Sequence, residues 1–518
     1  MAQRASEYLH PTLQDRTPAT TTPLSIADSA CIRFADTGGI WVFHPSPSGA
    51  PPIHHLRSSL VSALALFPHW AGQVAFVEHR PGGIHSERCG RLQVSYGYDS
   101  DPGVGWTVVE HDFPAASIVP EAGALSRGPW NCDVFPEAKL MPGDAGLPST
   151  RVQLNRFSCG GYAVAIKVLH VLADAQSLLL FVHEWAAQCR TECGNPSPSP
   201  FAKPIFDPAA VNARAAGNVD AAVPDAAIMD TAMALPQAWY DLWDTNAEGY
   251  LPFLVDPFQR SIAQDVPNAA TLLPATAPPW TTWDIFRPVS RVVYHFSGAQ
   301  LKALKKHVQS DGGNSADVSR LDVLLAQLFI LITRARQHQQ APSNNVTLSL
   351  TMDMRRRLSP PLPDTNLGSP VFLSQIQEIA SAVRGSTVAD IASKLRRTTK
   401  AFTADAVAAY LHASAFEPTP LRLMHSFVGS HSLTVSSWQR LRLYEVDFEG
   451  TRNKPAYVHD AAALIDGLVI VMDPLVDDEG VDVMLSLDAE TIPHLATEMA
   501  EAGRGSLYIV FPTILQYQ

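Results

Sequence analysis

The feature that most restricts the fold is an abrupt change of hydrophobic period around residue 170. Residues 161–169 (GYAVAIKVL) form a short apolar run with β-branched members, which is typical of a buried strand. Residues 175–189 (AQSLLLFVHEWAAQC) instead show the spacing of a helix. Asp174 stands directly before them, where a carboxylate can accept the first free backbone N–H groups. The sequence therefore predicts strand, tight loop and helix, with His170 and Asp174 at the two ends of the loop.

Strand and helix patterns alternate along the rest of the chain. We predict helices over 54–67, 299–308 and 321–336, and strands over 73–77, 151–157, 289–296, 346–352, 441–448, 455–458, 468–472 and 481–486. This interleaving predicts a mixed α/β fold. Because 518 residues exceed one ordinary core, we expect two domains. Their expected bounds are 1–225 and 289–518, and a crossover over 226–288 that carries many aromatic residues joins them. At the end of the first domain, the composition of residues 192–226 is typical of a linker.

Composition and charge exclude several classes of protein. Hydrophobic residues make up 46% of the chain and charged residues 17%, so the chain is not intrinsically disordered. A net charge of −12 argues against nucleic acid and anionic membranes as partners. The sequence has neither an apolar leader nor a run long enough to span a bilayer. The six cysteines lack zinc-site spacing, so we expect reduced thiols in a cytoplasmic protein without a metal.

His170 is the candidate catalytic residue. An imidazole with an ordinary pKa of about 6.5 is largely neutral and still basic near pH 7, which suits a general base. A loop at the end of a strand can present such a ring to a cleft, although a lone histidine at a strand end is more often structural. Asp174 could orient the ring or simply cap the following helix. The sequence contains no G-x-S-x-G, GxGxxG or P-loop motif, which argues against a serine nucleophile, a dinucleotide site and a phosphate-binding loop.

The loop and four further segments together resemble one enzyme family. His170–Asp174 matches the HxxxD signature of the BAHD acyltransferases, and Ser436-Ser437-Trp438 leading to Asp447-Phe448 resembles the family's Ser-Trp and Asp-Phe-Gly run. The segment 56–74 is similar to the family's early helix with its P-x-A-G segment, and the segment 321–336 is similar to the helix that opens its second half. The segment 351–370 is similar to the family's Arg-x-Arg-Leu, Pro-Pro-Leu-Pro and Gly-Asn stretch, with Ser369 in place of Asn. The wide spacing from Asp447 to Lys454-Pro455 is closest to the fungal branch, which includes trichothecene 3-O-acetyltransferases.

This resemblance implies two chloramphenicol-acetyltransferase-like domains with a channel at their interface. Acyl-CoA, by default acetyl-CoA, would enter from one side as a cosubstrate, and a small secondary metabolite would enter from the other side as the acceptor. His170 would then take a proton from the acceptor's hydroxyl or amine, which attacks the thioester without a covalent enzyme intermediate. The family pattern also implies a monomer with no tightly bound cofactor.

Roles for single residues follow from the resemblance. Asp174 belongs with His170 to the catalytic motif, and the resemblance implies that this Asp is mainly structural and pairs with an Arg. Asp447 and Arg355 would be structural, with Arg355 as the expected partner of Asp447. Arg440 is the expected contact of the acceptor. The expected contacts of coenzyme A are Ser436, Ser437, Trp438, Lys302 and Lys305.

Two departures from the family pattern motivate alternatives. Ala175 follows the HxxxD motif where Gly is usual, and Ala continues a helix well. Glu449 stands where the family has the Gly of Asp-Phe-Gly, and we expect a strained loop there because that Gly commonly serves a positive φ. The same fold repurposed as a coenzyme-A-independent cyclase or condensing enzyme is therefore an alternative. The related condensation domains use HHxxxDG, whereas Leu169 and Ala175 stand at the outer positions here. A non-catalytic binding protein is the third reading.

Overall fold

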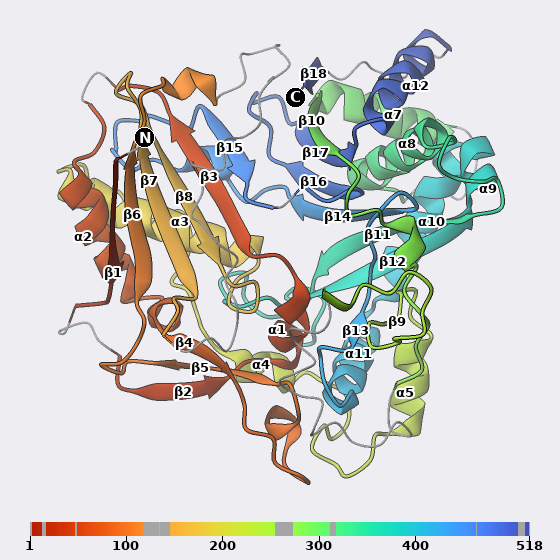
Figure 1. Cartoon of the computed structure of the whole chain (residues 1–518), viewed down its shortest axis with the longest axis horizontal. Coiled ribbons are helices and arrows are strands. Elements are labelled where there is room, and N and C mark those ends of the chain that lie inside the picture. Colours follow the sequence, from red (N-terminus) through yellow and green to blue (C-terminus); the bar gives the residue numbers. More distant parts are fainter. Residues whose placement is uncertain are drawn as a thin grey trace.

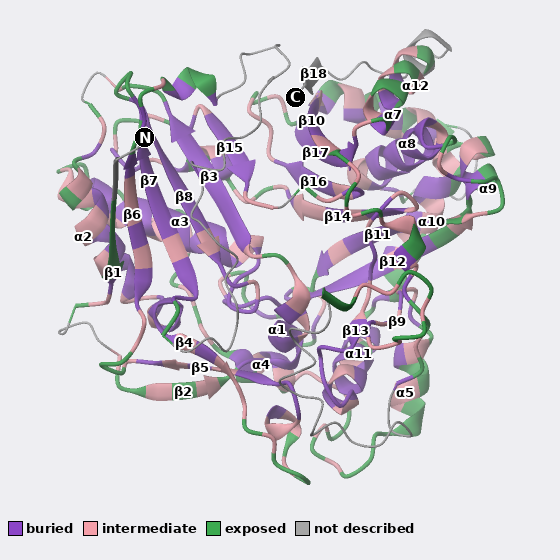
Figure 2. Cartoon of the chain, viewed as in Figure 1, coloured by how far each residue is buried: buried purple, intermediate pink, exposed green. Residues whose placement is uncertain are grey.

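Two large β-sheets, one built mostly from each half of the chain, form the framework of the computed structural model (Figure 1). The structure describes residues 3–12, 17–46, 49–118, 134, 146–253, 273–310, 317–462, 464–505 and 513–516. Strands and helices interleave in both halves, so the predicted mixed α/β class is confirmed. The strands of both sheets are largely buried, whereas the outer helices show exposed faces (Figure 2).

The N-terminal sheet has six strands in the order β1-β6-β7-β8-β3-β15. Their bounds are β1 (Gln3–Leu9), β6 (Val104–Glu110), β7 (Thr150–Arg156), β8 (Tyr162–Val168), β3 (Thr37–Phe43) and β15 (Tyr457–Asp460). Only β6 and β7 pair in parallel. A smaller sheet has the order β2-β5-β4, from β2 (Thr20–Pro23), β5 (Leu92–Tyr96) and β4 (Gln73–Phe76). The strands predicted over 73–77, 151–157 and 161–169 are thus confirmed.

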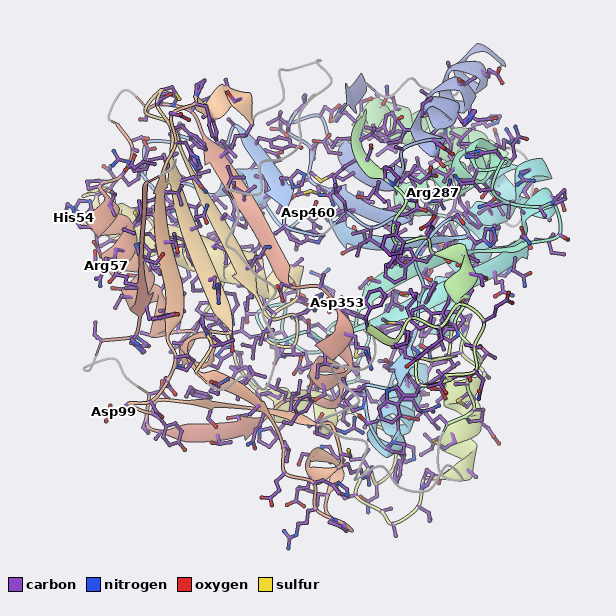
Figure 3. All side chains as sticks on the ribbon, in the orientation of Figure 1. His54, Arg57, Asp99, Arg287, Asp353 and Asp460 are labelled. Atoms are coloured by element: carbon purple, nitrogen blue, oxygen red, sulfur yellow. The ribbon has the colours of Figure 1, made fainter. Side chains whose placement is uncertain are left out.

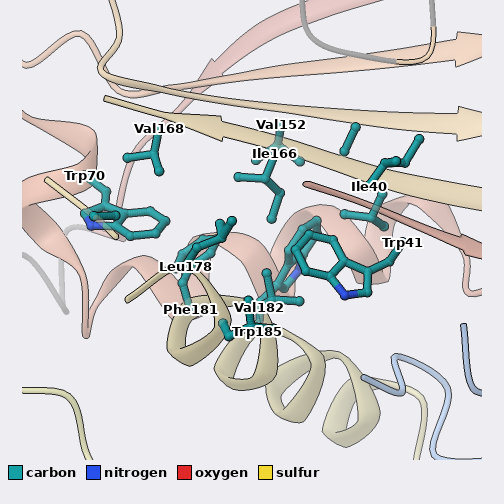
Figure 4. Close-up of a cluster of buried hydrophobic side chains, with 14 of the residues drawn as sticks. Ile40, Trp41, Trp70, Val152, Ile166, Val168, Leu178, Phe181, Val182 and Trp185 are labelled. Atoms are coloured by element: carbon teal, nitrogen blue, oxygen red, sulfur yellow. The ribbon is translucent and has the colours of Figure 1, made fainter. Parts of the chain in front are cut away.

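Helices α2 (Ile53–Leu64) and α3 (Ala175–Glu192) pack against each other and against the N-terminal sheet. In the core between them, Trp41 and Ile166 of the sheet meet Phe181 and Trp185 of α3, and all four side chains are fully buried (Figure 4). Burial of such large side chains is the main contribution that holds α3, and hence the loop before it, in place.

The C-terminal sheet has seven strands in the order β12-β11-β14-β16-β17-β10-β18. Their bounds are β12 (Val371–Ile379), β11 (Asn345–Asp353), β14 (Ser432–Trp438), β16 (Leu468–Met472), β17 (Val481–Asp488), β10 (Val289–Phe296) and β18 (Thr513–Gln516). Helices lie on the face of this sheet that is turned away from the N-terminal half (Figure 1). They are α7 (Gly298–Ser310), α8 (Arg320–Ala335), α9 (Ala380–Gly385), α10 (Val388–Ala401) and α12 (Thr491–Gly505).

The two faces of the C-terminal sheet have different partners, because side chains alternate along each strand. Val435 of β14 and Leu350 of β11 point to the helices and belong to the C-terminal core. On the opposite face, Trp438 of β14 and Met472 of β16 pack into the core of the N-terminal half. The inner face of the C-terminal sheet is therefore the surface on which the two halves meet.

The segments that join the halves are packed rather than free. They include α1 (Ile26–Ala30), α4 (Pro208–Asn212), α5 (Ala226–Met233), α11 (Ala404–Phe416) and the pair β9 (Tyr240–Asp241) with β13 (Leu423–Met424). The buried guanidinium of Arg422 bonds Glu417 at 2.6 Å and Asp241 at 2.7 Å, which fixes β9 beside β13. The expected linker 192–226 also contacts the C-terminal half, since Ile205 forms a β-bridge with Asn366.

Residues 441–460 differ most from the sequence prediction. The strand predicted over 441–448 is wrong: a short turn of 3-10 helix covers Leu443–Glu445, preceded by Arg442 with a left-handed φ of 60° that interrupts extended backbone. Phe448 then packs into the N-terminal core, and β15 joins the edge of the N-terminal sheet by pairing with β3. The chain therefore returns to the first half late in the sequence, inside the range expected to form the second domain.

Membrane-spanning helices and metal-binding clusters are both absent from the described residues. No helix among them is long and apolar enough to cross a bilayer. Nor do three or more of their His, Cys, Asp or Glu side chains gather where a metal ion could bind. No disulfide joins the cysteines within the described ranges, namely Cys31, Cys89, Cys159, Cys189 and Cys193. Cys132 lies outside the described residues.

Candidate active site

The loop that carries His170 has a defined local structure. Strand β8 ends at Val168, and the next residues form a turn in which Leu172 N–H donates to the carbonyl of Leu169 over 2.9 Å. Helix α3 begins at Ala175, and the carboxylate of its N-cap, Asp174, accepts from the backbone N–H of Ser177 over 2.9 Å. The predicted strand, loop and capped helix are confirmed, and Asp174 is a capping residue.

The loop docks onto the C-terminal half at Gly368. Ala173 and Gly368 form a parallel β-bridge, and the backbone N–H of Asp174 donates to the Gly368 carbonyl over 3.0 Å. Gly368 has a φ of 117°, and a Cβ there would lie 2.7 Å from an oxygen of Asp28. Only glycine fits this close approach, because any side chain would meet both backbone strain and a clash. The loop that carries His170 is thus positioned by contacts from both halves of the chain.

The Asp174 carboxylate also forms a buried ion pair with Arg355. The two Arg355 Nη atoms lie 2.5 Å and 3.1 Å from the two Asp174 oxygens, and the Arg355 side chain is only 1% exposed. Burial by itself lowers the pKa of Arg355, but Asp174 and Asp353 outweigh that effect and raise it above its usual range. The expected pairing of Arg355 with Asp447 is therefore wrong, because the Arg355 guanidinium is already held by Asp174.

Asp447 has a local role in its own loop. Its carboxylate accepts from the backbone N–H groups of Glu449, Gly450 and Arg452, at 2.9, 2.9 and 3.0 Å. Arg190 of α3 donates to the Asp447 backbone carbonyl over 2.6 Å, so the loop is tied to the N-terminal half.

The strain expected at Glu449 is also absent. The left-handed residues of this loop are Gly450, with a φ of 72°, and Arg452, with a φ of 63°, and Glu449 is not among the positive-φ residues. Glu449 is buried instead, and its carboxylate accepts from Asn453 Nδ2 at 2.7 Å and Thr451 Oγ1 at 3.0 Å. The glycine of this loop has moved by one position, which removes the motive for a remodelled site.

The imidazole of His170 is held by residues that the sequence reasoning missed. Its Nδ1 lies 2.8 Å from the hydroxyl of Ser369, whose own backbone N–H donates to Asp28 Oδ1 over 2.6 Å. Phe34 packs edge-on against the ring, with centroids 5.1 Å apart. Ser369 and Asp28 are fully buried, while His170 keeps part of its surface accessible. Ser369 and His170 are 199 positions apart, so no local pattern could predict their contact. The one signal for Ser369 in the sequence was that it stands where the family carries Asn.

The electrostatics of this arrangement favour a neutral ring. Burial lowers the pKa of His170 below its usual 6.5, and the nearby Asp174 carboxylate only partly opposes that effect. A neutral imidazole that donates its Nδ1 proton to Ser369 has a lone pair on Nε2. Burial raises the pKa of Asp28, although its hydrogen bonds to Ser25 and Ser369 act in the opposite direction. The arrangement can therefore present one basic nitrogen of fixed orientation.

The residues expected to bind coenzyme A do not lie together. On β14, Ser436 and Trp438 share the inner face of the sheet, whereas Ser437 has the parity of Leu433 and Val435, which face the helices. Arg440 lies beyond the end of β14 with its side chain exposed, and its backbone N–H donates to Asp473 over 2.5 Å.

Lys302 and Lys305 lie elsewhere, on helix α7. That helix is on the face of the C-terminal sheet turned away from the N-terminal half (Figure 1). Lys302 there forms an exposed ion pair with Glu479 at 2.6 Å. The structure therefore does not bring these lysines beside His170.

The chain is similar to known proteins over most of its length. A model of the Transferase family matches residues 4–233 and 281–502. The chain is 25% identical over 512 residues to acyltransferase AFT15-1 of Alternaria alternata, covering 93% of this chain and 94% of that protein. It is 27% identical over 439 residues to hydroxycinnamoyltransferase 2 of Oryza sativa subsp. japonica, covering 84% of each.

Solved structures show the same fold over nearly the full length. The crystal structure of F. graminearum TRI101 complexed with coenzyme A and deoxynivalenol superposes with a TM-score of 0.65 and 16% identity, covering 96% of this chain and 100% of that chain. Vinorine synthase gives a TM-score of 0.63 with 17% identity, covering 97% and 98%.

Proposed function

Because the chain belongs to the Transferase family of BAHD acyltransferases, which act with acyl-CoA, we propose that His170 is the general base of an acyl transfer to a small secondary metabolite. One observation carries this proposal. His170 is a partly accessible imidazole at the meeting of the two halves, with a lowered pKa and with Nδ1 already engaged by Ser369. Its Nε2 is then the group that can accept a proton from a substrate.

The proposed reaction needs no further nucleophile from the protein. The hydroxyl or amine of the acceptor gives its proton to His170 Nε2 as its oxygen or nitrogen attacks the thioester carbonyl. The carbon–sulfur bond then breaks, and the leaving thiolate of coenzyme A takes the proton back from the imidazolium. Asp174 stabilises that imidazolium, since its charge raises the pKa of His170. A positioned base of this kind typically contributes about 10²–10⁴-fold to the rate.

The inner face of the C-terminal sheet suggests where the substrates lie. Over β16, β17 and β10 this face is buried against the N-terminal half: Ile470, Met484 and Val293 pack into its core, and Arg291 forms a buried ion pair with Asp460 at 3.2 Å. Over β11 and β14 it is polar and partly accessible, at Thr351 and Ser436. We place the proposed substrate channel over this polar part, with Ser436 and Trp438 toward the acyl-CoA. Acetyl-CoA as donor, the contacts of Ser437, Lys302, Lys305 and Arg440, and a monomeric state stay predictions.

A panel experiment tests this function. Purified protein is mixed with a set of acyl-CoA thioesters and a set of hydroxyl and amine acceptors, and both free thiol and product mass are recorded. We expect at least one pair to release thiol and give the acylated acceptor. Intact-protein mass spectrometry after incubation with the donor alone should show no added acyl group. A stable acyl-enzyme, or no transfer from any thioester, would contradict the proposal.

A further inference from the structure

A charged group that is tied through Arg355 to the loop of His170 has no role in the reaction described so far. Asp353 is the last residue of β11, and its side chain is 45% exposed although it lies between the two halves (Figure 3). A carboxylate at the centre of a protein is exposed to this extent only where an open space reaches it.

The direction of the Asp353 side chain follows from the sheet register. Its neighbours Met352 and Met354 pack into the C-terminal core on the helix side. Val371, which pairs with Asp353 across the β11–β12 ladder, packs into the core of the N-terminal half. Because residues directly opposite in a ladder share a face, the Asp353 carboxylate lies on the inner face of the sheet.

The contacts of Asp353 leave one oxygen unsatisfied. Oδ1 accepts from the backbone N–H of Arg355 at 2.9 Å and from its Nη1 at 3.1 Å. Oδ2 has no hydrogen-bond partner among the residues that the structure describes. Through Arg355, Asp353 is tied to Asp174 and so to the loop of His170.

The two carboxylates around Arg355 outnumber the single positive charge that they share. One guanidinium, Arg355, serves both the Asp174 and the Asp353 carboxylates. The adjacent arginines bond elsewhere, since Arg356 pairs with Asp364 at 2.6 Å and Arg357 donates to backbone carbonyls of Thr399 and Phe402. Desolvation, together with the charge of Asp174, raises the pKa of Asp353. A cation brought to Oδ2 would therefore relieve an unfavourable negative charge.

We propose that the Asp353 carboxylate is an acceptor-recognition group, and that the acceptor carries a positively charged amine away from the atom that is acylated. The ammonium donates to Oδ2 of Asp353, while the acceptor's hydroxyl lies against Nε2 of His170. The inference rests on the proposed function, because it assigns the substrate class of the same site. Phe34, packed against His170, would face the apolar part of such an acceptor.

The test uses two alcohols of one shape. Dimethylaminopropanol is cationic, and its tertiary amine cannot form a stable amide, so only its hydroxyl is acylated. Isohexanol has the same skeleton with carbon in place of nitrogen. With acetyl-CoA as donor, we expect wild-type kcat/KM to favour the cationic alcohol by about tenfold, since a hydrogen bond between charged groups is stronger than one between neutral groups.

The variant Asp353→Asn should bring that ratio close to one, mainly through KM of the cationic alcohol. The matched control Asp364→Asn removes a neighbouring exposed carboxylate, 50% exposed in its pair with Arg356, and should keep the wild-type ratio. If Asp353→Asn lowers kcat for both alcohols alike together with the thermal midpoint, Asp353 is only structural and the inference is overturned. An unchanged ratio overturns it too.

A binding measurement separates this inference from the proposed function. Saturation-transfer NMR on His170→Ala, which cannot use the base, compares binding of the two alcohols with and without Asp353→Asn. Stronger binding of the cationic alcohol that is lost in the double variant supports the inference even if no transfer is found. Equal binding of both alcohols overturns it, whatever the panel of thioesters shows.

Discussion

Nδ1 of His170, two residues after β8 of the N-terminal sheet, lies 2.8 Å from the hydroxyl of Ser369, two residues before β12 of the C-terminal sheet. Each half thus supplies one member of the pair. Ser369 is itself braced by Asp28 through its backbone N–H. The orientation of the candidate base therefore depends on how the two halves are docked.

Replacing Ser369 by Ala should slow acyl transfer while the protein stays folded. The loss of one neutral hydrogen bond is worth about 0.5–1.5 kcal/mol, which corresponds to a decrease in kcat of roughly threefold to tenfold. KM for acyl-CoA should change little, because Ser369 contacts the ring rather than the donor. Ser369→Asn, whose amide oxygen can also accept from Nδ1, should recover part of the rate. Full activity in Ser369→Ala would show that the contact does not orient the base.

The pH profile of kcat/KM with an alcohol acceptor should have a single acidic limb. The neutral ring is the active form, so activity is lost as pH falls and His170 becomes protonated. Burial lowers the pKa of His170, which puts the midpoint of that limb below 6.5. A steady-state profile between pH 4 and 9 measures it. A midpoint above 6.5 would mean that the imidazolium is favoured by the site, contrary to the geometry described.

Arg355 and Arg356 are adjacent but should respond very differently to replacement. Arg355→Ala leaves Asp174 charged and buried without its partner, which typically costs about 3–5 kcal/mol of unfolding free energy. Arg356→Ala breaks an exposed pair with Asp364 and should cost at most about 1 kcal/mol. Urea unfolding of both variants gives the comparison. Similar values for the two would contradict the role assigned to the Arg355–Asp174 pair.

Gly450 should be intolerant of a side chain. Its φ of 72° strains any other residue, and a Cβ there would lie 2.5 Å from Cβ of Asn195. We expect Gly450→Ala to lower the unfolding free energy by about 2 kcal/mol or more. Gly160, with a φ of 85° and open space around it, is the matched control and should lose only about 1 kcal/mol. Equal losses would mean that the Asn195 contact relaxes freely.

Local sequence patterns predicted most helices and strands well, because hydrophobic period and helix capping depend on residues that are close together in the sequence. β10 begins and ends at the predicted residues 289 and 296, and Asp174 caps α3 as its spacing suggested. The strand predicted at 441–448 failed since the left-handed Arg442 is not encoded by hydrophobic alternation. Pairings across the two halves could not be read from spacing, because they depend on docking. Arg355 therefore pairs with Asp174 rather than Asp447, and neither the contact of Ser369 with His170 nor the exposed carboxylate of Asp353 was predicted.

The central claim is that the imidazole of His170 removes the acceptor's proton. The most direct measurement is the acyl-transfer rate of His170→Ala, with the same donor and acceptor that serve the wild type best. The exposed His54 on α2 gives the control variant His54→Ala, far from the site (Figure 3). We predict a loss of about 10²–10⁴-fold in kcat for His170→Ala and wild-type rates for His54→Ala. A folded His170→Ala protein with full activity would contradict the account.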